Sequence, residues 1–322
     1  MSAVKPWLEN LTIAKLHRLA IAIGAPCSGT KAVRIEGIRH AVTNVASNDR
    51  SDPSDLSLLS IDMGIRNLAF AHITAPLQAT NSAEYLQYQK PTLQSWRRLA
   101  VSQSLYATST VPLSFRVESS SETSASKESF EPADYALHAY ELINHMLQTY
   151  QPNHVLIERQ RFRSGGGSSV QEWTIRVGVF EGMLYASLRT MIEERKMRLR
   201  VEPMQPSRVN RYWLGDFVRP STRKLVGQEV KRAKIRLVGN MLQGADANIC
   251  VGKGMQPIVA EFVSGCNKVS KSKPTANAGK VKLDDLADSL LQGLSWIKWQ
   301  NNRRRIEVLG RDAIDLDSGP VS

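Results

Sequence analysis

The clearest hydrophobic pattern in the chain is a pair of apolar runs in residues 56–73, LSLLSIDMGIRNLAFAHI. The first run stops at the carboxylate of Asp62, the chain turns at Met63 and Gly64, and the second run begins at Leu68. This order is typical of a buried strand followed by its hairpin partner. An aspartate at this position either caps the turn or, if it is buried, needs a cation or strong hydrogen-bond donors nearby.

Carboxylates stand at two further places in the apolar pattern. The apolar run at residues 154–157 ends at Glu158, and the segment KLDDLADSLLQGLSW carries Asp284, Asp285 and Asp288. Because Asp288 lies about one helical turn from the other two aspartates, at least two of the three share a helix face. Like charges on one face are costly without positive charge between them, and divalent cations with oxygen ligands are the usual remedy.

Periodicity and turn residues predict the rest of the chain. Residues 11–42 show two helical patterns separated by a turn at 24–30, and the polar segment 46–55 is expected to be a linker. Residues 78–91 are expected to form a long surface connection. Further strands are predicted at 93–101, 155–158 and 198–202, and helices at 134–150, 170–195, 223–241 and 283–299.

Composition and charge narrow the class of protein. The 322 residues are 42% hydrophobic, and 42 Lys and Arg against 30 Asp and Glu give a net charge of +12. This charge indicates a polyanionic partner, although a general basic bias without nucleic-acid contact is the alternative. The three cysteines form no CxxC pair, which argues against a disulfide framework or a structural zinc site. No apolar run reaches 18 residues, so no membrane span is expected. We also expect no small-molecule cofactor.

Basic residues gather in segments suited to a DNA backbone. Arg159, Arg161 and Arg163 precede the glycine-rich stretch 164–169, where arginines can contact phosphates bidentately and glycines let backbone amides approach closely. A flexible, solvated loop is the alternative interpretation. The predicted DNA-binding residues are Lys31, Arg159, Arg161, Arg163, Ser164, Gly165, Gly166, Gly167, Lys231, Lys280 and Lys282.

Three motifs in order carry a resemblance to a known family. SIDMGIRNLAF, VLIERQRFRSGG and KLDDLADSLLQGL resemble the fungal mitochondrial Holliday-junction resolvases, which are similar to bacterial RuvC and belong to the RNase H-like superfamily. The resemblance covers about residues 56–299 and implies an α/β fold with an RNase H-like mixed β-sheet flanked by helices. Residues 11–42 resemble a small SAP-like helical DNA-binding module, and an ordinary helical hairpin packed on the main domain is the alternative.

The resemblance also implies a domain organisation and an activity. We expect a SAP-like module at 1–45, a linker at 46–55, a resolvase domain at 56–306 and a tail at 307–322, with a low-complexity insertion at about 118–131 and a basic loop at about 267–282. The implied protein is a homodimeric endonuclease that resolves four-way DNA junctions by paired symmetric nicks in mitochondrial DNA recombination and segregation, in the matrix nucleoid. The helix at 170–195 corresponds to one that helps form the dimer in RuvC-like enzymes, and core packing is the alternative.

The family chemistry implies two Mg²⁺ ions in each active site, with Mn²⁺ as a substitute. Asp62 would bridge the two ions, Glu158 would hold one, and Asp288 would hold the other together with Asp284 or Asp285. Two alternatives stay open: a non-catalytic architectural DNA-binding protein on a degenerate nuclease fold, and an RNase H-like nuclease acting on RNA:DNA hybrid. The presence of all the expected carboxylates argues against degeneration.

Overall fold

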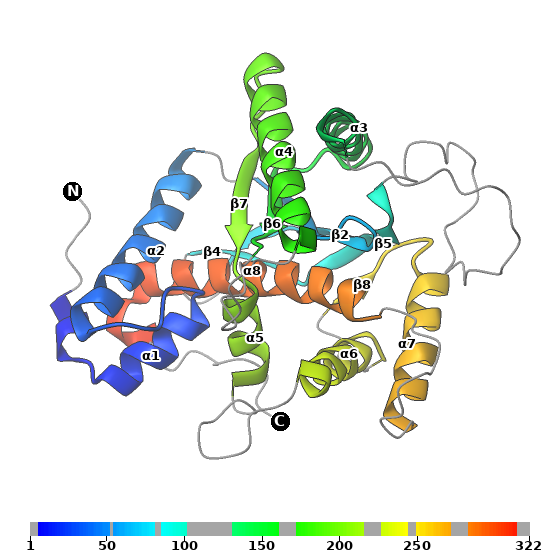
Figure 1. Ribbon diagram of the computed structural model, residues 1–322. Helices are drawn as coiled ribbons and strands as arrows, with labels where there is room; N and C mark the ends of the chain where they lie inside the picture. Colours follow the sequence, from blue (N-terminus) through cyan, green and yellow to red (C-terminus); the bar gives the residue numbers. More distant parts are fainter. Residues whose placement is uncertain are drawn as a thin grey trace, which may run out of the picture.

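A six-stranded mixed sheet lies at the centre of the computed structural model, with the strand order β7-β6-β1-β2-β5-β8 (Figure 1). β1 pairs antiparallel with β2 and parallel with β6, so the predicted mixed sheet is confirmed. The strands are β1 (Leu56–Asp62), β2 (Leu68–Ala75), β5 (Thr92–Leu99), β6 (His154–Glu158), β7 (Arg200–Met204) and β8 (Cys250–Val251). The structure describes residues 6–51, 54–80, 85–101, 131–160, 172–215, 227–243, 249–271 and 283–313, without the side chains of 46–51 and 269–271.

Helices cover both faces of the sheet, which explains why β1 reads as a nearly continuous apolar run. Leu58 and Leu156 face a hydrophobic core formed with one set of helices, whereas Leu59 and Ile61 face a core formed with the other set. The first set is α5 (Pro206–Leu214), α6 (Gly227–Gln243), α7 (Gln256–Lys271) and α8 (Leu283–Leu309), and the second is α3 (Pro132–Tyr150) and α4 (Glu172–Glu194). Figure 1 shows these two layers on opposite sides of the strands.

The N-terminal helices pack onto the far end of α8. The 3-10 helix η1 (Pro6–Asn10), α1 (Ile13–Ala22) and α2 (Lys31–Ser51) share a small core that also contains Ile306 of α8. Gly24 has a φ of +66°, and a Cβ atom at this position would lie 2.3 Å from the Trp299 ring. The backbone carbonyls of Ala22, Ile23 and Gly24 accept hydrogen bonds from the side chains of Asn302, Arg303 and Arg208 respectively. The segment after α1 is therefore fixed directly to α8 and α5.

Two predicted boundaries are corrected by the structure. α2 continues through Ser51, into the segment expected to be a linker, and it ends shortly before Pro53, in keeping with the tendency of helices to stop ahead of proline. α7 continues through Lys271, so the start of the expected basic loop at 267–282 is helical. The expected insertion at 118–131 falls outside the described residues except for Glu131, and the tail at 307–322 is helical as far as Ala313.

Several elements were not predicted. The stretch expected to be a surface connection at 78–91 contains a small hairpin, β3 (Leu77–Ala79) and β4 (Leu86–Tyr88). α7 and β8 are also new, and α8 extends ten residues beyond the expected end at 299 because Ile306 continues its buried stripe. Tyr212 and Trp213 belong to the core, where the Trp213 indole donates to Ser295 Oγ at 2.7 Å. No helix in the described ranges has the length and apolar character needed to cross a membrane.

Candidate active site

The ends of β1 and β6 place two of the predicted carboxylates side by side. These strands are parallel, with Ile61 opposite Ile157, so the residues that follow, Asp62 and Glu158, lie at the same edge of the sheet. The backbone N–H of Met63 donates to Glu158 Oε2 at 3.3 Å, which directs the glutamate toward the β1 turn. Asp62 is 8% exposed, so its carboxylate is largely removed from water.

Helix α8 brings two more carboxylates to this edge. Ser60 Oγ donates to the backbone carbonyl of Ser289 at 2.8 Å, and the Gln292 amide donates to both Ser60 Oγ and the Ile61 carbonyl at 3.1 Å. The close approach depends on Gly293, because a Cβ atom there would lie 2.6 Å from Ile73 Cδ1. These contacts fix the first turns of α8, which carry the aspartates, against the end of β1.

The carboxylates at this edge of the sheet act electrostatically on one another. Burial raises the pKa of Asp62 well above 3.8, and the negative charges of Glu158, Asp288 and Asp285 raise this pKa further. Burial also raises the pKa of Asp288, against the opposing effect of Lys234. Asp62, Glu158, Asp285 and Asp288 thus form one acidic cluster, which we call the carboxylate cluster.

Two lysines of α6 pair with the aspartates of α8. Lys234 contacts both carboxylate oxygens of Asp288, and Lys231 contacts Asp284. Asp284 is engaged with this more exposed lysine, whereas Asp285 is the neighbour that acts on Asp62. Asp284 in turn acts on Asp288, so both aspartates between which the sequence left the choice open belong to this electrostatic environment, and Asp285 is the one that acts on Asp62.

The carboxylate cluster fits a divalent cation by its chemistry. Its donors are carboxylate oxygens, the ligands that Mg²⁺ and Mn²⁺ prefer, and their mutual repulsion is the kind that a bound cation relieves. Within the described ranges, no three His, Cys, Asp or Glu side chains are already placed to hold an ion as they stand. Asp288 is turned to Lys234, so its carboxylate would have to reorient to bind a cation together with the other carboxylates of the cluster.

The predicted DNA-binding residues fall into two groups. Three of them lie within the described residues. Lys31 Nζ donates to the backbone carbonyl of Glu9 at 2.6 Å, and Lys231 pairs with Asp284. Arg159 directly follows Glu158, and its backbone N–H donates to the Met204 carbonyl at 2.8 Å. The others lie outside the described residues: Arg161, Arg163, Ser164, Gly165, Gly166, Gly167, Lys280 and Lys282.

Two residues near the cluster were not selected as site residues from sequence. Lys234 stands in a helix with several other Lys and Arg residues, and such a run usually means a solvated face. Glu181 of α4 accepts a hydrogen bond from the backbone N–H of Gln160 at 3.0 Å, two residues after Glu158. Burial raises the pKa of Glu181, and the Glu158 charge adds to this effect. Helical periodicity predicts that Glu181 lies next to the buried apolar side of α4. It does not predict that Glu181 lies near the carboxylate cluster.

Helix α4 combines a buried and an exposed apolar face. Val177, Phe180, Leu184 and Leu188 are buried in the core with α3 and the sheet, as the alternative of core packing expected. Ile175 and Val179 lie on the opposite side of α4 and are 48% and 45% exposed, and α3 adds the exposed Leu137 and Tyr140. We call these four exposed residues the α3–α4 patch. Trp173 lies on the other side of α4, where the Arg66 guanidinium sits 5.0 Å from its ring centroid.

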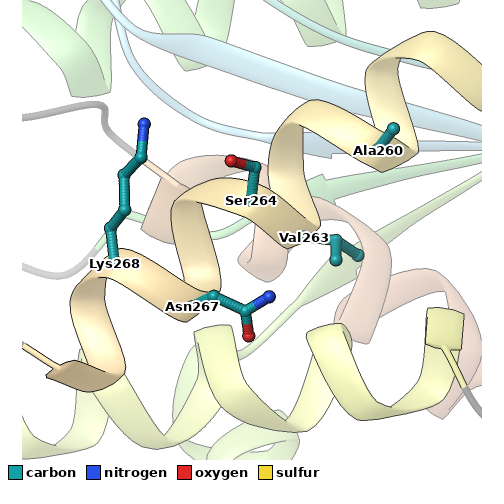
Figure 2. Close-up of a pocket in the computed structure, with 5 residues that line it drawn as sticks. All are labelled: Ala260, Val263, Ser264, Asn267 and Lys268. Carbon is teal, nitrogen blue, oxygen red and sulfur yellow. The ribbon is translucent and has the colours of Figure 1, made fainter.

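A hollow of about 450 Å³ lies along α7, apart from the predicted site residues. Figure 2 shows the five lining side chains, which all come from this helix: Ala260, Val263, Ser264, Asn267 and Lys268. The lining contains no carboxylate, so the hollow supplies no ligand of the type found in the carboxylate cluster.

The match to a family model spans the positions of all five predicted carboxylates. Residues 58–306 match the family model described as mitochondrial resolvase Ydc2 / RNA splicing MRS1. The mitochondrial cruciform cutting endonuclease 1 of Schizosaccharomyces pombe is 28% identical over 177 residues, which is 54% of this chain and 60% of the relative. The chain thus spans less than two thirds of that relative's length.

Two further comparisons extend over most of the chain. The protein of the same name from Saccharomyces cerevisiae is 22% identical over 329 residues, covering 94% of this chain and 85% of the relative. The crystal structure of the yeast mitochondrial Holliday junction resolvase Ydc2 has a TM-score of 0.53 at 21% identity, covering 90% of this chain and 93% of that chain. This structural likeness shows a shared fold.

Proposed function

Because the chain belongs to the mitochondrial resolvase Ydc2 / RNA splicing MRS1 family, we propose that it is a structure-selective endonuclease that resolves four-way (Holliday) DNA junctions by paired symmetric nicks. The sequence resemblance to this family is confirmed by the match over residues 58–306. The observation that carries the proposal is the buried Asp62 at the end of β1, which shares its surroundings with Glu158, Asp285 and Asp288. A metal-dependent nuclease needs clustered carboxylates as metal ligands. In a purely structural sheet edge, buried carboxylates this close together would only lower stability.

The proposed catalytic residues are Asp62, Glu158, Asp285 and Asp288, which would hold two Mg²⁺ ions, with Mn²⁺ as a substitute. Asp284 is assigned a supporting place through its pair with Lys231. When bound, the ions supply the positive charge that activates a water nucleophile and stabilises the leaving 3′ oxygen. The chain's own contribution is a desolvated site in which the Met63 N–H orients Glu158 and α8 is held against β1.

The proposed DNA contacts follow from charge and position. The net charge of +12 provides the attraction, and Arg159 stands next to a proposed metal ligand. In the N-terminal module, Lys31 and Arg39 are both engaged with Glu9, whereas Lys15 and Arg18 of α1 are exposed. We therefore assign the phosphate contacts of this module first to Lys15 and Arg18.

The proposed assembly is a C₂ homodimer. A four-way junction has near-twofold symmetry, so two copies of the site related by a twofold axis can nick matching strands. The α3–α4 patch supports this assembly, because exposed Tyr, Ile, Leu and Val side chains on neighbouring helices are suited to an interface. Both curated relatives are named mitochondrial, and we place this protein in the mitochondrion, in the matrix nucleoid, acting in DNA recombination and segregation.

The test compares three substrates at equal salt with Mg²⁺ present: a four-way junction, a linear duplex and an RNA:DNA hybrid. Paired nicks in the junction alone are the expected result. Preferential cleavage of the hybrid would instead identify an RNase H-type nuclease. Junction binding without nicking would support the non-catalytic alternative, which deserves a test because the family description also names RNA splicing. Salt must be held constant because affinity for nucleic acids depends strongly on it.

A further inference from the structure

We propose that the Lys234 ammonium group neutralises part of the negative charge of the carboxylate cluster. It thereby competes with divalent cations for Asp288 and weakens their binding. This inference rests on the proposed function, since it takes Asp288 to be a metal ligand. It adds a residue that the family resemblance and the sequence pattern did not single out for the site.

The geometry of the pair is that of a built-in cation site. Lys234 is 7% exposed, and its Nζ contacts both Oδ1 and Oδ2 of Asp288. A lysine this deeply buried is rare unless its charge is paired. Because the ammonium engages both oxygens of Asp288, a divalent cation can bind that carboxylate only by displacing the lysine or by sharing an oxygen with it.

The packing of α6 keeps the lysine in this position. Ile235 and Val238 are buried in the core shared with α8. On the α7 side, Cys266 Sγ donates to the Ile235 carbonyl at 3.6 Å, and a Cβ atom at Gly239 would lie 2.7 Å from that sulfur. α6 is thus held between α7 and α8, so Lys234 cannot leave Asp288 by a shift of the helix alone.

The charges decide the direction of the effect. Asp288 acts electrostatically on Asp62, so a cation held by these two carboxylates would lie close to the Lys234 ammonium. The Lys234 side chain is 9% exposed and that of Asp288 is 31% exposed, so the repulsion between the ammonium and a bound cation is only partly screened by water and the lysine lowers metal affinity. Removing its charge should strengthen metal binding.

Lys231 offers a matched comparison on the same helix. It pairs with Asp284, but its side chain is 59% exposed, against 9% for Lys234. Solvent screening makes the charge of such an exposed lysine count for much less. The two lysines therefore differ mainly in burial and in the aspartate that they contact.

The experiment is a calorimetric titration of the full chain with Mn²⁺ alone, without DNA, at one pH and one ionic strength. We expect Lys234→Met to bind Mn²⁺ about tenfold more tightly than wild type, the size of effect typical of one nearby charge. Lys234→Arg, which keeps the charge, should bind within about twofold of wild type, and Lys231→Met within about threefold. As a second readout, Mn²⁺ should raise the melting temperature of Lys234→Met more than that of wild type.

The outcomes separate this inference from the proposed function. Saturable binding to wild type with unchanged or weaker binding to Lys234→Met overturns the inference alone, because the lysine would then only position Asp288. A wild-type chain that shows no saturable Mn²⁺ binding overturns the proposed metal site and the inference with it. If circular dichroism shows that Lys234→Met is unfolded, Lys234→Gln replaces it, and the same tightening is expected because the charge is again lost.

Discussion

The hydroxyl of Ser60 donates a hydrogen bond to the backbone carbonyl of Ser289 at 2.8 Å, joining β1 to α8 across 229 positions of the chain. Ser60 lies two residues before Asp62, and Ser289 directly follows Asp288. This one contact therefore helps to position Asp62 and Asp288, two proposed metal ligands that are far apart in sequence, relative to each other. The neighbouring Gly293 lets the helix come close enough to make it.

Gly293→Ala should separate α8 from the sheet. The new Cβ would lie 2.6 Å from Ile73 Cδ1 and 3.3 Å from Ser60 Cβ, and such overpacking typically costs about 1–3 kcal/mol. Urea denaturation should show this loss, together with reduced junction nicking. Gly182→Ala in α4 is the control: nothing lies within 4 Å of its would-be Cβ, so a gain of about 0.5–1 kcal/mol is expected. Equal stability of the two variants would contradict the packing argument.

Asp62→Asn should abolish cleavage and preserve DNA binding. Loss of the central carboxylate is expected to slow junction nicking by about 10³-fold or more. Fluorescence anisotropy on a labelled junction should give an affinity within about twofold of wild type, because phosphate contacts dominate binding. Glu193→Gln, at an exposed ion pair with Arg189, serves as the charge-matched control with wild-type nicking. Near wild-type cleavage by Asp62→Asn would remove this residue from the mechanism.

His154 should make stability fall with decreasing pH. It is buried against Trp296, with ring centroids 4.8 Å apart, and burial lowers its pKa to about 3, aided by the charges of Arg200 and Arg304. The unfolded chain protonates this histidine near pH 6.5 while the folded chain does not, so the unfolded state binds more protons between about pH 6.5 and 3. The contribution of His154 to the free energy of unfolding should therefore fall by about 1.4 kcal/mol per pH unit within this window and be constant above it.

The measurement is urea denaturation of wild type and His154→Gln at pH 7.5, 6.0 and 5.0. The stability difference between the two proteins should shift in favour of the variant at each step down in pH. Asp and Glu titrations are common to both proteins and cancel in this difference. The exposed His145, changed to Gln, provides the control for removing a histidine at the surface of the protein.

The α3–α4 patch should control self-association. Val179→Asp places a charge within the proposed interface, where desolvation should raise the dimer dissociation constant by about tenfold or more. Sedimentation velocity over a concentration series measures this change. Val308→Asp on α8 is the matched control, since Val308 is 53% exposed and Val179 is 45% exposed. If the dimer dissociation constant were unchanged in Val179→Asp but raised in Val308→Asp, the interface would lie on α8 and not on α3 and α4.

Strand-terminal carboxylates could be identified from sequence because an acidic residue that ends an apolar run contrasts sharply with its neighbours. Asp62 and Glu158 were found in this way, and the mixed α/β fold and the family followed from the order of the motifs. The choice of Asp285 over Asp284 as the neighbour of Asp62 could not be made from spacing, because both lie about one turn from Asp288. The rotation of α8 against β1 decides it, and that rotation depends on Gly293 and Gln292.

Lys234 escaped prediction for a different physical reason. A lysine in a basic helix is ordinarily solvated, and its burial here depends on α7 and α8 packing around α6. α7 itself was missed, although Val259, Phe262 and Cys266 recur in it at helical spacing. Without that third helix, nothing in the sequence of α6 distinguishes the buried Lys234 from the exposed Lys231.

The proposed metal ligands and the attachment of the N-terminal module share one uninterrupted helix, α8. Asp288 and Arg303 are fifteen positions apart on it, so at a rise of about 1.5 Å per residue the helix sets their separation at about 22 Å. α8 therefore sets the distance between the carboxylate cluster and the N-terminal helices. Inserting a single residue between these points would turn the module by about 100° around the axis, so the length of this helix fixes the position of the N-terminal helices relative to the proposed metal ligands.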